Sequence, residues 1–211
     1  MDRITPPAKS IDAVVFDLGN VLVDWNPRHL YRKIFGADER AMEAFLKDVC
    51  NTAWNEQQDR GRSWADAIAE AVARHPSQES NIRAYHERWP EMLAGSIQGT
   101  VDILKDLKAS GVRLLALTNW SSETFPVAIE RFPFLSDFEG ILVSGRERMM
   151  KPEPAIFNLL IERYKLTAGS TLFIDDSIGN IEAATRLGLI GLHFQGPDKL
   201  RADLRLAGFS I

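Results

Sequence analysis

The chain has 211 residues, of which 45% are hydrophobic, and its 14 glycines and 10 prolines are ordinary numbers for a globular protein. This composition excludes a disordered or collagen-like chain, and the length allows one domain or two small ones. The net charge of −4, without a concentrated cluster of Lys and Arg, argues against a nucleic acid or an anionic membrane as partner and favours a small molecule.

Five short apolar runs predict the strands of a parallel sheet. They lie at residues 13–16, 114–117, 140–143, 171–174 and 189–194. Consecutive apolar residues are typical of strands that are buried on both faces of such a sheet. Helical patterns separate the last four runs. Another helical pattern, with Val101, Leu104 and Leu107, precedes the second run. Strands alternating with helices predict an α/β fold with a doubly wound, Rossmann-like sheet.

About a hundred residues separate the first strand from the second, far more than one crossover helix requires. Within this interval, residues 27–90 show helical patterns at residues 27–35, 38–49, 63–75 and 78–89, and they contain no convincing strand. We therefore expect an all-helical cap subdomain at residues 24–95. The α/β core would consist of residues 1–23 and 96–211.

Polar residues follow four of the predicted strands. They are Asp17 and Gly19 after the first strand, Thr118, Asn119 and Trp120 after the second, Lys151 beyond the third, and Asp175, Asp176 and Asn180 after the fourth. Open α/β sheets bind their ligands at the carboxyl ends of the strands. We therefore expect these residues to converge on one site.

The chemistry of these side chains points to phosphate and Mg²⁺. Asp17 and Asp176 are hard oxygen ligands of the kind that Mg²⁺ prefers. Mg²⁺ and Lys151 would offset the repulsion between these carboxylates and a phosphate, and the Thr118 hydroxyl could donate a hydrogen bond to a phosphoryl oxygen. One carboxylate is then free to attack phosphorus, which predicts hydrolysis through a covalent aspartyl phosphate.

The order of these motifs carries a resemblance. Along the chain they are Asp17 with residues 19–21, then Thr118, then Lys151, then Asp175 and Asp176 with Asn180. In this order they resemble the four motifs of the haloacid dehalogenase superfamily, and the inserted helices resemble its C1-type helical cap. The resemblance covers nearly the whole chain. It is nearest to the group that holds the glucose-1-phosphate phosphatases and the 2-haloacid dehalogenases.

The resemblance assigns a role to each motif residue. It implies that Asp17 is the nucleophile and a Mg²⁺ ligand, and that the Gly19 backbone carbonyl and Asp176 complete the metal ligands from the protein. Thr118 and Lys151 would hold the phosphoryl oxygens. Asp175 and Asn180 would support the metal and Lys151.

Gly19 departs from the phosphatase pattern, because many phosphatases of this superfamily carry an Asp there as general acid and base. Losing a positioned acid or base can cost on the order of 10²–10⁴ in rate. Turnover is then slow, or another group substitutes, or the leaving group needs little protonation. We expect the last, because an anomeric sugar phosphate leaves as a relatively acidic hemiacetal. Residues 17–21 are also similar to the first motif of the glucose-1-phosphate phosphatases.

Two alternatives to a phosphatase stay open. A 2-haloacid dehalogenase would use Asp17 to attack carbon and would also lack Asp at the Gly19 position. Those enzymes usually carry Tyr there, however, and Ser at the position of Asp176. A second carboxylate beside the nucleophile would repel a carboxylate substrate, so Asp176 favours the phosphatase. A non-catalytic phosphate-binding or interaction protein is the other alternative, and the retained Asp17 argues against it.

We expect four residues to contact the substrate. Asn119 and Trp120 follow the second strand, Trp25 lies at the entry to the insertion, and Trp54 begins a polar stretch, residues 54–62, that could face the active site. A single cysteine, Cys50, excludes an internal disulfide and suits a reducing compartment. Without a recognisable signal peptide or membrane span, we expect a cytoplasmic protein, either a monomer or a homodimer.

Overall fold

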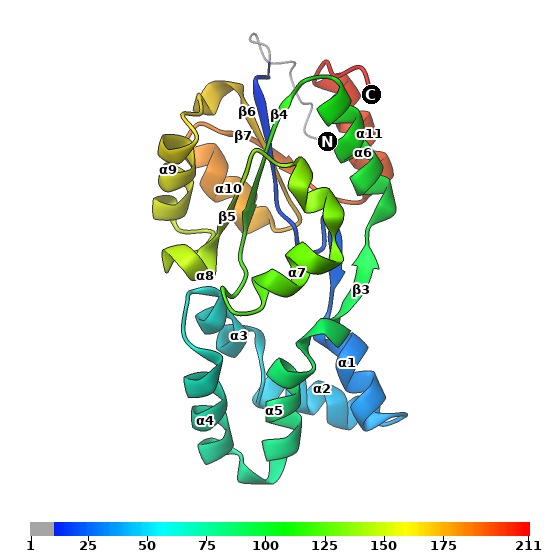
Figure 1. Ribbon diagram of the computed structural model, residues 1–211, viewed down its shortest axis with the longest axis vertical. Helices are drawn as coiled ribbons and strands as arrows, with labels where there is room; N and C mark the ends of the chain where they lie inside the picture. The colour runs from blue at the N-terminus through cyan, green and yellow to red at the C-terminus, as the bar shows by residue number, and fades with distance from the viewer. Residues whose placement is uncertain (1–10) are drawn as a thin grey trace.

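A parallel sheet of five strands forms the centre of the computed structural model, which describes residues 11–211 (Figure 1). Its strand order is β5-β4-β1-β6-β7. The strands are β1 (Ala13–Phe16), β4 (Arg113–Thr118), β5 (Gly140–Val143), β6 (Thr171–Asp175) and β7 (Ile190–His193). Phe16 is paired with Ala116 of β4 and Ile174 of β6, so the three central strands end at the same level. This register brings the residues that follow them together.

Helices cover both faces of the sheet, and alternate residues of β1 face the two layers. Val14 and Phe16 belong to one apolar cluster, together with residues of α6 (Gln98–Ala109) and α11 (Pro197–Leu206). Ala13 and Val15 belong to the other cluster, together with residues of α9 (Pro154–Arg163) and α10 (Ile178–Arg186). The predicted α/β, doubly wound, Rossmann-like architecture is confirmed. The shorter elements are α7 (Phe125–Arg131), η3 (Pro133–Asp137), α8 (Ser144–Glu147) and η4 (Ala168–Ser170).

A helical insertion, residues 27–92, lies beyond the carboxyl ends of the strands (Figure 1). A short antiparallel ribbon of β2 (Val23–Trp25) and β3 (Leu93–Ser96) joins it to the sheet. It contains α1 (Pro27–Phe35), α2 (Glu39–Asp48), α3 (Thr52–Asp59), α4 (Trp64–Arg74), η1 (Pro76–Gln78), α5 (Glu79–Glu87) and η2 (Trp89–Met92). The expected limits of the cap subdomain, residues 24 and 95, fall within the ribbon and stay a prediction.

Aromatic residues form the centre of the helical insertion. The Trp54 ring lies 5.6 Å from that of Trp64 and 5.2 Å from that of Tyr85, and the Tyr31 ring lies 4.9 Å from that of Phe45. Such rings contribute large buried areas, and they continue the apolar cluster that packs on one face of the sheet. Cys50 is buried in the same cluster.

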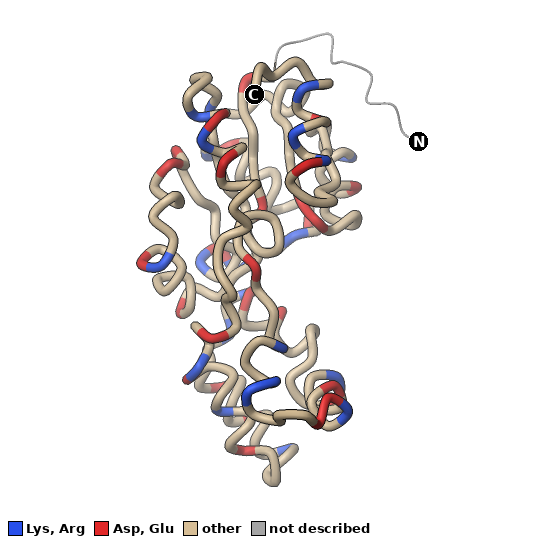
Figure 2. Tube along the Cα trace, turned by 90° about the vertical axis from the view of Figure 1, so that its right-hand side faces the viewer, with Lys and Arg blue, Asp and Glu red and all other residues tan. Residues whose placement is uncertain are grey.

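Charged residues are distributed over the surface without segregation. Figure 2 shows basic and acidic residues interspersed along both the sheet and the helical insertion. Within residues 11–211, no helix has the length and apolar character needed to cross a membrane.

Candidate active site

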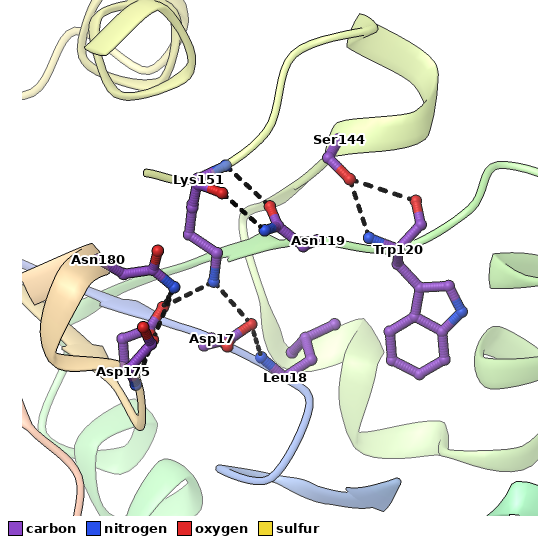
Figure 3. Close-up of polar contacts among 9 residues, drawn as sticks. Asp17, Leu18, Asn119, Trp120, Ser144, Lys151, Asp175 and Asn180 are labelled. Carbon is purple, nitrogen blue, oxygen red and sulfur yellow. Dashed lines mark hydrogen bonds and ion pairs between the residues drawn. The ribbon is translucent and has the colours of Figure 1, made fainter. Parts of the chain in front are cut away.

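Lys151 lies between two carboxylates beyond the carboxyl ends of β1 and β6 (Figure 3). Its Nζ lies 2.9 Å from Oδ1 of Asp17 and 2.7 Å from Oδ2 of Asp175. The lysine side chain is only 1% exposed, and Asp175 is fully buried. Charges withdrawn from water in this way require close partners, and these ion pairs supply them. The sheet therefore brings together residues that are more than 150 positions apart in the sequence.

Asn119 holds the backbone of Lys151 from both sides. Its Oδ1 accepts a hydrogen bond from the Lys151 backbone nitrogen, and its Nδ2 donates one to the Lys151 carbonyl, each at 2.9 Å. Asn119 follows the last residue of β4, so this pair fixes the lysine loop to the sheet (Figure 3). The sequence suggested substrate contact for Asn119, and the structure adds this positioning contact.

Asp175 is held by the start of α10 as well as by Lys151. Its Oδ1 accepts hydrogen bonds from the backbone nitrogen of Ser177 at 2.8 Å and from Nδ2 of Asn180 at 2.9 Å. Both oxygens of Asp175 therefore have donors, because Lys151 occupies Oδ2. The arrangement keeps Lys151 in place through a fixed anion. The supporting role expected for Asp175 and Asn180 stays a prediction.

Burial controls the ionisation of the site. It raises the pKa of Asp17 to about 7, although the Lys151 charge opposes the rise and the Asp175 charge adds to it. Burial alone would lower the pKa of Lys151, but the charges of Asp17 and Asp175 outweigh it and the pKa is raised. Burial and the Asp175 charge also raise the pKa of Asp176. A cation near Asp17 and Asp176 would favour their ionised forms.

The carboxylates of Asp17, Asp175 and Asp176 fit a divalent cation. Each offers an oxygen atom, and these atoms all lie within 4.8 Å of one another. Because the oxygens of Asp175 already accept from Lys151, Asn180 and Ser177, Asp17 and Asp176 are the residues left to act as ligands. An all-oxygen donor set of this kind suits Mg²⁺. Gly19, whose carbonyl is the other expected ligand, lines the same cavity.

A cavity of about 550 Å³ opens above these residues, between the sheet and the helical insertion. The predicted site residues that line it are Asp17, Gly19, Trp25, Asn119, Lys151, Asp176 and Asn180. The insertion contributes others that the sequence did not single out, notably Asn55 and Asp59 of α3. A cavity formed by two layers in this way can enclose a small ligand.

Four predicted site residues do not line this cavity. Asp175 is fully buried against Lys151. Thr118, the last residue of β4, is 1% exposed and is not among the described residues that line the cavity. Trp120 lines a smaller adjoining cavity of about 60 Å³, where its ring packs 5.3 Å from that of Trp89. Trp54 is buried in the aromatic core of the insertion, and its Nε1 donates to the Ala67 carbonyl at 3.4 Å. The expected substrate contact of Trp54 thus finds no support in its position.

Asn55 and Asp59 could have been found in the sequence if residues 52–59 had been identified as a helix. Residues four apart share one helical face, and Nδ2 of Asn55 donates to Oδ2 of Asp59 at 2.9 Å. The helix carries only one large apolar residue, Trp54, so its periodicity is too weak to detect. Asn51 provides the start signal, since its side chain accepts from the Trp54 backbone nitrogen.

The curated relatives include phosphatases. The chain is 28% identical to the sesquiterpene phosphatase astK of Aspergillus oryzae over 182 residues, which cover 86% of this chain and 88% of the relative. It is 24% identical to a phosphoglycolate phosphatase of Vibrio cholerae over 190 residues, which cover 85% of this chain and 82% of the relative.

Solved structures share the fold. A haloacid dehalogenase family enzyme of Bacteroides thetaiotaomicron, solved as a magnesium complex, superposes with a TM-score of 0.73 at 23% identity, covering 93% of this chain and all of that one. The L-2-haloacid dehalogenase of Xanthobacter autotrophicus superposes with a TM-score of 0.64 at 15% identity, covering 95% of this chain and 85% of that one. The model of the haloacid dehalogenase-like hydrolases matches residues 11–188. The chain therefore belongs to the haloacid dehalogenase-like hydrolase family.

Proposed function

We propose that the protein is a Mg²⁺-dependent phosphatase that hydrolyses a small phosphorylated metabolite through an aspartyl phosphate on Asp17. The observation that carries this proposal is the pair of carboxylates, Asp17 and Asp176, beside Lys151 in one cavity. A cation held between two carboxylates suits a phosphate, whereas an uncompensated pair would repel the carboxylate of a haloacid. The phosphatase relatives support the same reaction class.

The protein residues account for the first step of this reaction. A carboxylate oxygen of Asp17 attacks phosphorus, the bond from phosphorus to the substrate oxygen breaks, and Lys151 neutralises charge on the phosphoryl group. Mg²⁺, when bound by Asp17, Asp176 and the Gly19 carbonyl, supplies further neutralisation of phosphoryl charge. Asp175 and Asn180 position Lys151, and Thr118 stays a proposed phosphoryl contact.

The substrate that we favour is a sugar phosphate. Asn119, Asn55 and Asn26 place amide groups around the cavity, and sugar hydroxyl groups can hydrogen bond to such groups. An isoprenoid phosphate is a second candidate, because Leu46, Cys50 and Tyr85 form an apolar part of the same lining and a relative is a sesquiterpene phosphatase. In either case residues 24–95 would act as a cap that selects the substrate in a cytoplasmic enzyme, as a monomer or a homodimer.

The reaction class can be tested with p-nitrophenyl phosphate. We expect turnover with Mg²⁺, loss of turnover with a chelator, and loss of turnover in Asp17→Asn, which keeps the size of the side chain but removes the nucleophile. Release of halide from 2-chloropropionate without metal would instead support a dehalogenase. If the purified chain catalyses neither reaction but binds phosphate, the protein is a binding module.

The substrate class can be tested by comparing glucose 1-phosphate, glucose 6-phosphate, phosphoglycolate and farnesyl phosphate side by side. A sugar phosphatase should show its highest kcat/KM on one of the two sugars. The highest value on farnesyl phosphate would favour the apolar alternative. If glucose 1-phosphate reacts no faster than glucose 6-phosphate, an acidic leaving group does not explain why the chain has Gly19 where many phosphatases have an acid.

A further inference from the structure

The helical insertion brings a carboxylate, Asp59, to the space beside Gly19. Gly19 has nothing within 4 Å of the point where a side chain would begin, so the position usually filled by an acid is open. The smaller cavity, of about 60 Å³, adjoins this open space, and both Gly19 and Asp59 line it. Asp59 also lines the larger cavity together with Asp17 and Lys151. It thus lies where the two cavities meet.

From this geometry we infer that Asp59 is the catalytic proton donor and acceptor of the reaction, in place of the side chain that Gly19 lacks. The inference rests on the proposed phosphatase function and adds a residue to it. Of the explanations for the acid missing at Gly19, the inference favours the one in which another group substitutes for it over the one in which the leaving group needs little protonation. Tyr85, which also lines the larger cavity, is a poorer candidate because burial holds the pKa of its hydroxyl well above the usual range.

The position of Asp59 is fixed by both layers of the molecule. Within α3, Nδ2 of Asn55 donates to its Oδ2 at 2.9 Å. From the core, the Ser144 hydroxyl donates to its backbone carbonyl at 2.5 Å, and the Ser121 backbone amide donates to its carboxylate. A general acid has to be held near the reacting oxygen, and these contacts fix the Asp59 carboxylate from two sides.

The surroundings of Asp59 also suit proton transfer near neutral pH. Burial raises the pKa of its carboxyl group to about 7, which the Ser121 hydrogen bond opposes and the charges of Glu56 and Asp17 reinforce. A group whose pKa lies close to the working pH can both give and accept a proton. Glu56, on the same helix, is exposed and lines only the larger of the two cavities.

The two chemical steps balance with Asp59 as acid and then as base. As Asp17 attacks phosphorus, the bond to the leaving oxygen breaks, and that oxygen takes its electron pair together with the proton of Asp59. The Asp59 carboxylate then removes a proton from water, whose oxygen attacks the phosphorus of the aspartyl phosphate. The bond between phosphorus and Asp17 breaks, its electron pair returns to the Asp17 carboxylate, and inorganic phosphate leaves.

Leaving-group dependence distinguishes this role from a structural one. The experiment compares the wild type, Asp59→Asn and the control Glu87→Gln on 2,4-dinitrophenyl phosphate and on an alkyl phosphate, glucose 6-phosphate. Glu87 is exposed on α5 and lines neither cavity. We expect Asp59→Asn to lower kcat on the alkyl phosphate by about 10²–10³, because its poor leaving group needs the proton. On the dinitrophenyl ester the variant should release one equivalent of phenol rapidly and then turn over slowly, because only the second step requires the base.

The other outcomes overturn the inference. Unchanged turnover of the alkyl phosphate by Asp59→Asn, or an equal slowing of the first step on both esters, would exclude Asp59 as the acid while leaving the phosphatase intact. A wild type inactive on both esters would overturn the proposed function itself.

Asp59→Glu, which keeps the carboxyl group, should restore part of the lost activity. Glu87→Gln should stay within about twofold of the wild type, as expected for an exposed charge.

Discussion

Lys151 is the residue whose environment most constrains the site. Its ammonium group is buried between Asp17 and Asp175, and Asn119 holds its backbone. A buried ion pair contributes little net stability, but removing one partner leaves uncompensated buried charge. The two carboxylates therefore depend on Lys151 for the stability of the folded state, apart from any role it has toward the substrate.

This dependence predicts the stability of a lysine variant. Lys151→Met should lower the free energy of unfolding in chelator by about 3 kcal/mol, because two buried carboxylates lose their counter-charge. Adding Asp175→Asn should recover part of the loss, since one of these charges is removed. Urea denaturation of both single variants and the double variant measures the coupling. Simple addition of the two losses would contradict the prediction.

The carboxyl group of Asp59 predicts a pH dependence of stability. Its pKa is raised from 3.8 to about 7 in the folded state, so the folded protein keeps a proton that the unfolded chain releases. The corresponding stability is present below pH 3.8 and is lost as pH rises to about 7. Asp59→Asn does not titrate. Its stability relative to wild type should therefore rise by on the order of 2 kcal/mol between pH 5 and pH 8. Urea denaturation at both pH values measures this difference, and a constant difference would contradict the prediction.

At the scale of single residues, the sequence predicted the polar residues of the site better than the tryptophans that were expected to contact the substrate. Asp17, Asp175 and Asp176 follow strands whose apolar runs are unmistakable, and parallel strands must bring their carboxyl ends together. Trp54 and Asp59 instead depend on which way a short helix faces. Because residues two positions apart point to nearly opposite sides of a helix, the sequence indicated that residues 54–62 border the site without indicating which of them do so.

The helices and strands also divide into those that the sequence predicted and those that it did not. The strands of the sheet were predicted because each contains a run of apolar residues, and the central strand β1 is buried along its whole length. The edge strands β5 and β7 are only partly buried, but their apolar runs were still sufficient for the prediction. The ribbon of β2 and β3 was not predicted, because strands of three and four residues carry too little pattern. The short α8 was also not predicted. Its formation depends on the contacts at Gly145, where it meets the loop after β4.

The close approach at Gly145 predicts a packing defect in a matched pair of variants. A Cβ atom there would lie 2.5 Å from the Ser122 backbone nitrogen and 2.8 Å from the Trp120 carbonyl, and backbone cannot move aside cheaply. Gly145→Ala should therefore cost about 2 kcal/mol and displace α8 from the loop that carries Trp120. Gly169→Ala, where nothing lies within 4 Å, is the control and should stay within about 0.5 kcal/mol. Equal stabilities of the two variants in urea would contradict the close approach.

The arrangement of the whole molecule makes the cavity depend on contact between the helical insertion and the core. Trp64 of α4 donates from Nε1 to the Ser121 hydroxyl at 3.0 Å and from its backbone nitrogen to Glu123 at 3.0 Å. Arg60 forms an ion pair with Glu153 across the same boundary. Because residues from both layers line the cavity, these contacts hold together the two parts of its wall.

We therefore expect the hydrogen bond of the Trp64 indole to stabilise the contact between the insertion and the core. Trp64→Phe removes the hydrogen bond to Ser121 but keeps a ring to stack on Tyr85 and His86. A lost buried hydrogen bond of about 1 kcal/mol should speed amide hydrogen exchange in α3 severalfold and raise KM, because the closed arrangement is less populated. Arg74→Ala, at an exposed ion pair with Glu70 on the same helix, should change neither. If exchange in α3 stays at the wild-type rate in Trp64→Phe, the indole does not hold the layers together, and closure depends on the contacts of Arg60 and Ser144 instead.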